Sequence, residues 1–160
     1  MVCSIIYSLI IGFFFVGPNH SYSVLLPDGT QLVQVDTLEN NMINHTFVGL
    51  DKGSNMEYSL SFSIVDNEPY NLMEDQGVEK YEQDCNCKVE QSMKVEFTTF
   101  KGVKYSISKS VEGTKLGGEV YISEIQNGKS INVVSMALYN QRKHVESNLK
   151  PILNTLVLNL

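Results

Sequence analysis

The sequence MEYSLSFSIV at residues 56–65 places an apolar side chain at every second position, with glutamate or serine between them. A repeat of two residues is that of a β-strand, because successive side chains of a strand point to opposite faces of the sheet. A helix would scatter the same apolar residues around its axis. We therefore predict a strand here with one face in the core and one face that carries serines.

Strand and turn signals continue on both sides of this segment. Before it, residues 22–26, 31–35 and 46–50 have strand character, and Pro27-Asp28-Gly29-Thr30 forms a turn between the first two. After it, strand patterns recur at about residues 89–100, 103–108, 118–126 and 129–138. Lys101-Gly102 is predicted as a tight hairpin, and Asn127-Gly128 is typical of a type I′ hairpin. Residues 131–138 are mostly apolar, which predicts a central strand covered on both faces.

Two segments have helical periodicity instead. Residues 70–81 repeat apolar side chains at helical spacing, with Pro69 in the first turn. Residues 141–157 form the second, in which Pro151 should bend or restart the helix because it has no N–H for the carbonyl of Ser147. The order of four strands, helix, four strands, helix predicts an α+β fold. We expect a mainly antiparallel sheet of about six to eight strands with two main helices, arranged as an α/β/α sandwich.

The N-terminal residues 1–17, MVCSIIYSLIIGFFFVG, contain no charged side chain and are dominated by apolar residues. The run is slightly short of the roughly 20 residues that span a bilayer, and its length suits the apolar centre of a secretory signal. We predict that residues 1–21 are a signal peptide or an N-terminal anchor and that residues 22–160 form a single domain. The predicted location is secreted or periplasmic, with a membrane contact only through residues 1–17 if the leader stays uncleaved. A buried strand or helix of the core is the alternative for this segment.

The charge of the chain limits its partners. The formal net charge of -6 argues against binding to nucleic acid. Most acidic residues precede residue 85 and most basic residues follow it, which we interpret as charge matching inside one domain. The alternative is a basic face built from lysines of the second half, namely Lys94, Lys101, Lys104, Lys109 and Lys115.

Cys85 and Cys87, in the sequence Cys-Asn-Cys, are the candidate site residues. In an exported protein an even pair of cysteines favours a disulfide, although a bridge across one residue closes a very small ring. A local disulfide or a pair of free thiols is the first interpretation, and an intermolecular disulfide is the second. A metal site comes third, because two thiolates are only half of the four ligands of a structural zinc site. We expect no cofactor and no metal.

Catalytic motifs are absent from the sequence. It has no Gly-x-Ser-x-Gly elbow, Walker loop, dinucleotide fingerprint, His-Glu-x-x-His motif or calcium loop. His20, His45 and His144 are interpreted as ordinary surface histidines. The one nucleophile pair to consider is Cys85 or Cys87 with His144. We therefore expect no catalytic residues and no enzyme activity.

The opening strand Tyr22-Ser23-Val24-Leu25-Leu26-Pro27 resembles the start of the PsbP-like family. Three later segments are similar to that family as well: Phe100-Lys101-Gly102-Val103-Lys104-Tyr105, the hairpin around Asn127-Gly128, and Ile152-Leu153-Asn154-Thr155-Leu156. The resemblance covers most of residues 22–158 and rests on the order and spacing of the elements. It implies an α/β/α sandwich, export, and a non-enzymatic accessory or binding role.

The sequence as a whole predicts an exported non-enzymatic binding or accessory protein whose partner is another protein or a small ligand. Two alternatives remain. One is a redox- or metal-linked protein that uses Cys85 and Cys87. The other is a membrane-anchored structural protein that keeps residues 1–17.

Overall fold

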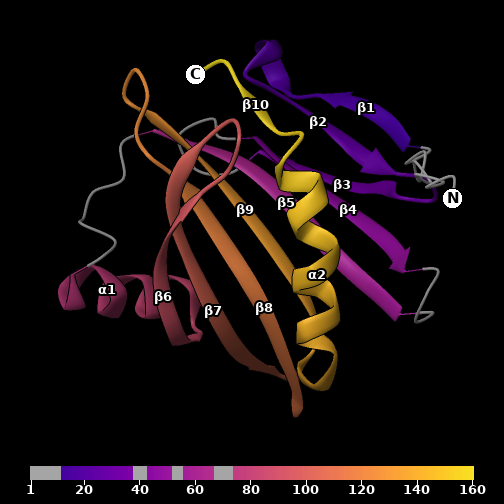
Figure 1. Ribbon diagram of the computed structural model, residues 1–160. Coiled ribbons are helices and arrows are strands. Elements are labelled where there is room, and N and C mark those ends of the chain that lie inside the picture. Colours follow the sequence, from indigo (N-terminus) through magenta and orange to yellow (C-terminus); the bar gives the residue numbers. More distant parts are fainter. Residues whose placement is uncertain (1–11, 38–42, 52–55, 67–73) are drawn as a thin grey trace, which may run out of the picture.

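The computed structural model describes residues 12–37, 43–51, 56–66 and 74–160 (Figure 1). The strands in these ranges are β1 (Gly12–Val16), β2 (Tyr22–Pro27), β3 (Gln31–Thr37), β4 (Ile43–Asp51), β5 (Met56–Asp66), β6 (Lys88–Glu96), β7 (Lys101–Val111), β8 (Thr114–Ser123), β9 (Lys129–Leu138) and β10 (Val157–Leu158). The helices are α1 (Asp75–Cys85) and α2 (Arg142–Leu153), with 3-10 turns η1 (Pro18–His20) and η3 (Tyr139–Gln141).

The strands form two antiparallel sheets. The larger sheet has the order β3-β4-β5-β9-β8-β7-β6, and the smaller one has the order β1-β2-β10. The predicted order of elements is observed as β2 to β5, α1, β6 to β9, and α2. The predicted α+β fold, with a mainly antiparallel sheet and two helices, is confirmed. The larger sheet has seven strands, within the predicted six to eight, and the described residues add a second sheet in which β1 and β10 pair with the two edges of β2.

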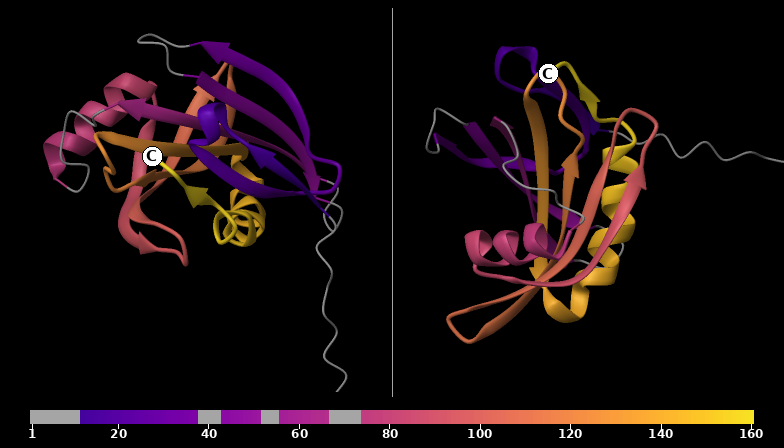
Figure 2. Two further views of the ribbon diagram at one scale, coloured as in Figure 1. Left: turned by 90° about the horizontal axis from the view of Figure 1, so that it is seen from above. Right: turned by 90° about the vertical axis from the view of Figure 1, so that its left-hand side faces the viewer.

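The two helices lie on opposite sides of the larger sheet (Figure 2). On one face, α2 and the smaller sheet pack on the main core, to which α2 contributes Leu149, Ile152 and Leu153. On the other face, Val78 and Tyr81 of α1 pack on a second cluster formed by Tyr105, Ile107, Val120 and Ile122. The larger sheet is therefore the middle layer, and the layer that contains α2 also contains the smaller sheet.

Strand β5 shows the alternation of buried and more exposed residues that its sequence predicts. Tyr58, Leu60 and Phe62 are buried in the main core, whereas Glu57 is exposed. Strand β9 pairs with β5 on one side and β8 on the other, as expected for a central strand. It carries Val133 in the main core and packs Val134 against the second cluster.

Several boundaries differ from those predicted. The β6–β7 turn lies at residues 97–100, where the Phe97 N–H donates to the carbonyl of Phe100 at 2.8 Å. Gly102 instead lies within β7. A Cβ added at this position would come within 1.9 Å of the carbonyl oxygen of Ile122, so a glycine here allows the neighbouring strand to approach closely. Helix α2 ends two residues after Pro151, and residues 157 and 158 pair with β2. Helix α1 begins at Asp75, and the predicted start near residue 69 lies outside the described residues.

Part of the predicted leader lies in the smaller sheet. Strand β1 pairs with β2 from Gly12 opposite Pro27 to Val16 opposite Ser23. The Phe15 side chain packs against the main core. Residues 1–11 lie outside the described residues, so the signal or anchor over residues 1–21 stays a prediction. Within the described ranges, no helix is both long enough and apolar enough to cross a membrane.

Candidate functional site

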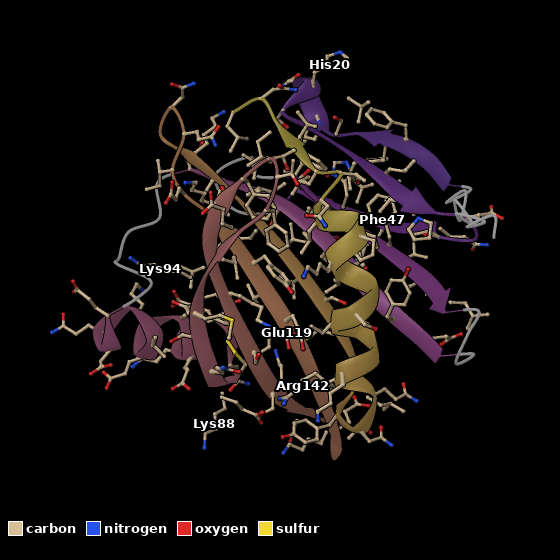
Figure 3. All side chains as sticks on the ribbon, in the orientation of Figure 1. His20, Phe47, Lys88, Lys94, Glu119 and Arg142 are labelled. Atoms are coloured by element: carbon tan, nitrogen blue, oxygen red, sulfur yellow. A yellow bond between two sulfur atoms is a disulfide. The ribbon has the colours of Figure 1, made fainter. Side chains whose placement is uncertain are left out.

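Cys85 and Cys87 form a disulfide at the C-terminal end of α1 (Figure 3). Between them, Asn86 has the left-handed backbone conformation, with φ of 49° and ψ of 51°, that commonly ends a helix. Lys109 of β7 donates from Nζ to the carbonyl of Cys85 at 3.0 Å. The disulfide therefore lies where the end of α1 meets the beginning of β6. Across the described ranges, no group of three or more His, Cys, Asp or Glu side chains is placed to bind a metal.

The disulfide should make only a modest contribution to stability. It closes a ring of three residues, and the chain-entropy model gives about 1–2 kcal/mol for so short a loop. We expect the Cys85→Ser/Cys87→Ser variant to lose about 1–2 kcal/mol of unfolding free energy in urea titrations. The reduced wild-type protein should have the same unfolding free energy as this variant. A much larger loss of unfolding free energy on reduction would show that the disulfide stabilises more of the fold than the small ring that it closes.

The histidines do not form a site with these cysteines. His45 of β4 is buried rather than exposed, which corrects the sequence-based interpretation, and its Nδ1 lies 3.1 Å from the hydroxyl of Tyr22. Burial lowers the pKa of His45, so the neutral imidazole is favoured. Residue 144 belongs to α2, on the opposite side of the larger sheet from the disulfide. The structure therefore gives no support to a Cys–His nucleophile pair.

A cluster of charged side chains lies beneath α2, around Glu119, which Figure 3 labels. Of its members, only Lys104 is named from the sequence, as part of a basic face. Glu119 of β8 is only 1% exposed, and its two carboxylate oxygens accept hydrogen bonds from the hydroxyl of Ser106 at 3.1 and 2.9 Å. Lys104 of β7 lies 3.5 Å from Glu119 and also forms an ion pair with Glu146 of α2. Burial raises the pKa of Glu119, and the positive charge of Lys104 opposes that rise.

This cluster also corrects the idea of a basic face. The Lys104 side chain is 8% exposed and faces α2. Lys109 lies five residues further along the same strand and contacts the end of α1 on the opposite face. Lys101, at the start of β7, forms an ion pair with Glu96 at 3.0 Å. Lys104 and Lys109 therefore lie on opposite faces of the sheet, so the five lysines do not form one basic face.

The largest opening that we describe arises where β5 and β9 separate. These strands pair from Asp66 opposite Lys129 to Ser59 opposite Met136. Beyond that point, β5 continues to pair with β4, and β9 continues to pair with β8 as far as Leu138. The two central strands therefore diverge at one end of the sheet.

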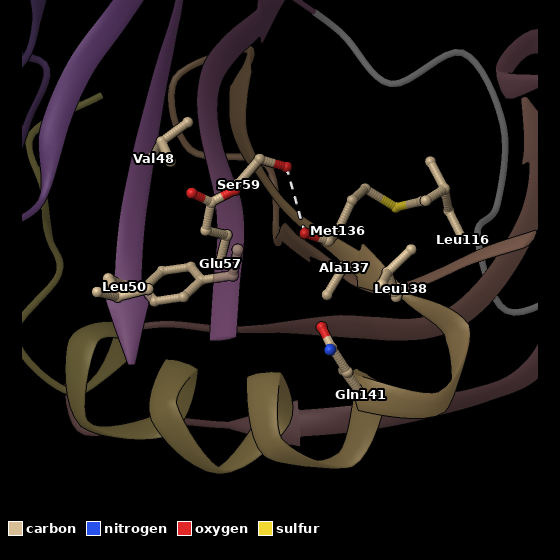
Figure 4. Close-up of a pocket in the computed structure, with 10 residues that line it drawn as sticks. Val48, Leu50, Glu57, Ser59, Leu116, Met136, Ala137, Leu138 and Gln141 are labelled. Atoms are coloured by element: carbon tan, nitrogen blue, oxygen red, sulfur yellow. Dashed lines mark hydrogen bonds between the residues drawn. The ribbon is translucent and has the colours of Figure 1, made fainter. Parts of the chain in front are cut away.

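This divergence leaves a pocket of about 850 Å³, which we call the fork pocket (Figure 4). Its apolar lining includes Val48, Leu50, Leu116, Met136 and Leu138. The polar lining side chains include Glu57, Ser59 and Gln141, and Ser59 donates to the carbonyl of Met136 at 3.4 Å. The volume lies within the usual range of ligand pockets, and a mostly apolar lining with a few polar groups is their usual composition.

The comparisons with known proteins identify the fold. No family model and no curated protein sequence matches the chain. The solution structure of cyanobacterial PsbP from Synechocystis sp. PCC 6803 is similar, with a TM-score of 0.61 at 12% identity over 91% of each chain. A crystal structure from Bacteroides thetaiotaomicron gives a TM-score of 0.61 at 14% identity over 93% of this chain and 49% of that one. The present chain thus spans about half of the Bacteroides chain.

A third similar structure is LpqN of Mycobacterium tuberculosis, described as involved in cell envelope biogenesis. Its TM-score is 0.53 at 10% identity, over 85% of this chain and 82% of that one. At these low identities the likeness concerns the fold alone. The chain has a PsbP-like fold, which confirms the resemblance drawn from the sequence.

Proposed function

We propose that this chain is an exported accessory protein of the cell envelope, and that it works without catalysis by binding an apolar group in the fork pocket. The group belongs to a small ligand or to a partner protein. The observation that carries the proposal is the divergence of β5 and β9, which opens an apolar pocket between these two strands at one end of the larger sheet. The shared fold with cyanobacterial PsbP and with LpqN supports the accessory and envelope role.

The chemistry of the pocket favours an apolar ligand without a negative charge. Leu50 and Leu138 in its wall are each 46% exposed, so a ligand would remove their apolar surface from water. Such burial contributes roughly 25 cal/mol per Å². Glu57 is the one carboxylate among the lining residues, and it is exposed. An anionic ligand would meet this carboxylate at close range, whereas a neutral ligand would not.

The neutral fluorescent probe N-phenyl-1-naphthylamine tests the proposal. We expect the probe to bind the wild-type chain, and the Leu138→Asp variant to bind it at least about ten-fold more weakly, a difference of roughly 1.4 kcal/mol. The reason is that the new carboxylate must lose water when the probe enters. Fluorescence titration gives both dissociation constants.

Leu32→Asp is the matched control for this test. Leu32 is the same residue type and has nearly the same exposure, 45%, but it lies on the edge strand β3 outside the fork pocket. It should leave probe binding unchanged. Equal weakening by both variants, or by neither, would contradict binding in the fork pocket. N-terminal sequencing of the protein recovered from outside the cytoplasm tests the exported part of the proposal.

A further inference from the structure

A second pocket, of about 380 Å³, lies between α2 and the strands β6, β7 and β8. We call it the α2 groove. One wall is apolar and aromatic and includes Val95, Phe97 and Tyr121, and the rings of Phe97 and Tyr121 meet edge to face with centroids 5.6 Å apart. It shares no lining residue with the fork pocket. The two pockets are therefore separate sites.

The charged side chain of Lys104 lies at this groove and is almost wholly buried, with 8% of it exposed. Its two carboxylate partners differ in kind. Glu119 is fully buried and is fixed by the hydroxyl of Ser106. Glu146 belongs to α2, lines the groove, and has a side chain that is 46% exposed. Lys104 thus has one fixed partner and one partner that can reach solvent.

Glu146 has other cations within reach on its own helix. Lys143 and Lys150 lie three residues before it and four residues after it, which places them on the same side of α2. Both also line the groove. If another anion occupied the place beside Lys104, Glu146 could therefore turn outward and pair with either lysine.

The lysines of the α2 groove can pair with an anion that enters it. Its lining residues include three lysines and two glutamates, and the buried Glu119 beside Lys104 adds a third carboxylate, so the charges around the groove balance. Burial raises the pKa of Tyr121, so its phenol stays protonated and is able to donate a hydrogen bond. An anion placed beside Lys104 would take over the position of one carboxylate, so it would add no further charge to the buried cluster.

We propose that the α2 groove binds a small carboxylate carried on an apolar or aromatic body, whose carboxylate replaces Glu146 as the second partner of Lys104. The apolar body lies against Val95, Phe97 and Tyr121. A volume of about 380 Å³ suits a compact ligand rather than a long chain. This site is independent of the fork pocket and of the function proposed for it.

The test compares two probes of the same shape, 2-naphthoate and 2-naphthamide. We expect the full chain to bind 2-naphthoate, and to bind the neutral amide at least about ten-fold more weakly in isothermal titration calorimetry. Equal affinities, or no binding of the acid, would overturn the proposal. Leu138→Asp should leave 2-naphthoate binding unchanged, which separates this result from a failure of the fork pocket.

A variant of Glu146 tests the exchange itself. Glu146→Gln removes the internal competitor for Lys104, so the affinity for 2-naphthoate should rise several-fold while that for 2-naphthamide stays the same. The matched control is Glu79→Gln, an exposed position of α1 on the opposite face of the sheet, which should change neither affinity. Unchanged or weaker binding of 2-naphthoate to Glu146→Gln would show that Glu146 does not occupy the ligand position.

Discussion

Replacing Lys104 by methionine is expected to lower the free energy of unfolding by about 3–5 kcal/mol, because it leaves a buried charge without its partner. The charge belongs to Glu119, which is 1% exposed and lies 3.5 Å from the ammonium group of Lys104. The serine hydroxyl that remains beside Glu119 supplies a hydrogen bond but no positive charge. Urea unfolding followed by circular dichroism measures the loss.

Glu119→Gln provides the matched control. It removes the buried carboxylate but leaves Lys104 paired with Glu146, so its effect should be much smaller than that of Lys104→Met. The double variant Lys104→Met/Glu119→Gln should regain most of the stability lost in Lys104→Met, because neither buried charge remains. If the double variant is as unstable as Lys104→Met, the loss comes from packing of the lysine stem rather than from the unpaired carboxylate.

Glu119 also makes the stability of the protein depend on pH. Burial raises the pKa of Glu119, so the folded protein holds this proton more tightly than the unfolded chain does. By linkage, the contribution of Glu119 to the free energy of unfolding falls as the pH rises from the ordinary glutamate range to the raised pKa of the folded state, and it is constant above that. Glu119→Gln should lack this fall. Lys104→Met should recover stability at acidic pH, where Glu119 becomes neutral.

The sequence predicts the sheet better than it predicts the sites. The alternation of residues 56–65 and the Asn127-Gly128 turn are local signals, and the structure contains the strand and the turn that they indicate. Lys104, Ser106 and Ser108 alternate with apolar residues in the same way and indicate a face open to solvent. In the structure α2 covers that face. This covering depends on how the last helix returns across the sheet. Glu119 gives one local signal of the charged cluster, because it is a single acidic residue beside an apolar run.

The fork pocket could not be predicted because it arises from pairing between distant residues. Ser59 and Met136, at the point of divergence, are separated by 77 positions in the sequence. No local pattern states where two such strands stop pairing. The apolar segment 1–17 presents a related difficulty, because the same residues suit both a leader and a strand. The structure places residues 12–16 of that segment in β1.

Strand β1 can be tested with two neighbouring phenylalanines. Phe15→Ala is expected to lower the free energy of unfolding by about 2–3 kcal/mol, somewhat less than for a fully buried phenylalanine because Phe15 is partly exposed. Its ring lies 4.9 Å from that of Phe47 and 5.1 Å from that of His45, centroid to centroid, so truncation removes contacts with the main core. Phe14 is 63% exposed, and Phe14→Ala should change stability by no more than about 0.5 kcal/mol.

The comparison decides how much of residues 1–21 belongs to the folded unit. A large loss for Phe15→Ala beside a small one for Phe14→Ala would mean that β1 is part of the domain, because only a docked strand makes its two faces unequal. Any leader that is removed would then have to end before Gly12, since cleavage near Ser21 would also remove the contacts of Phe15. Small and equal effects would mean that the domain is stable without β1, which is what a leader extending to residue 21 requires.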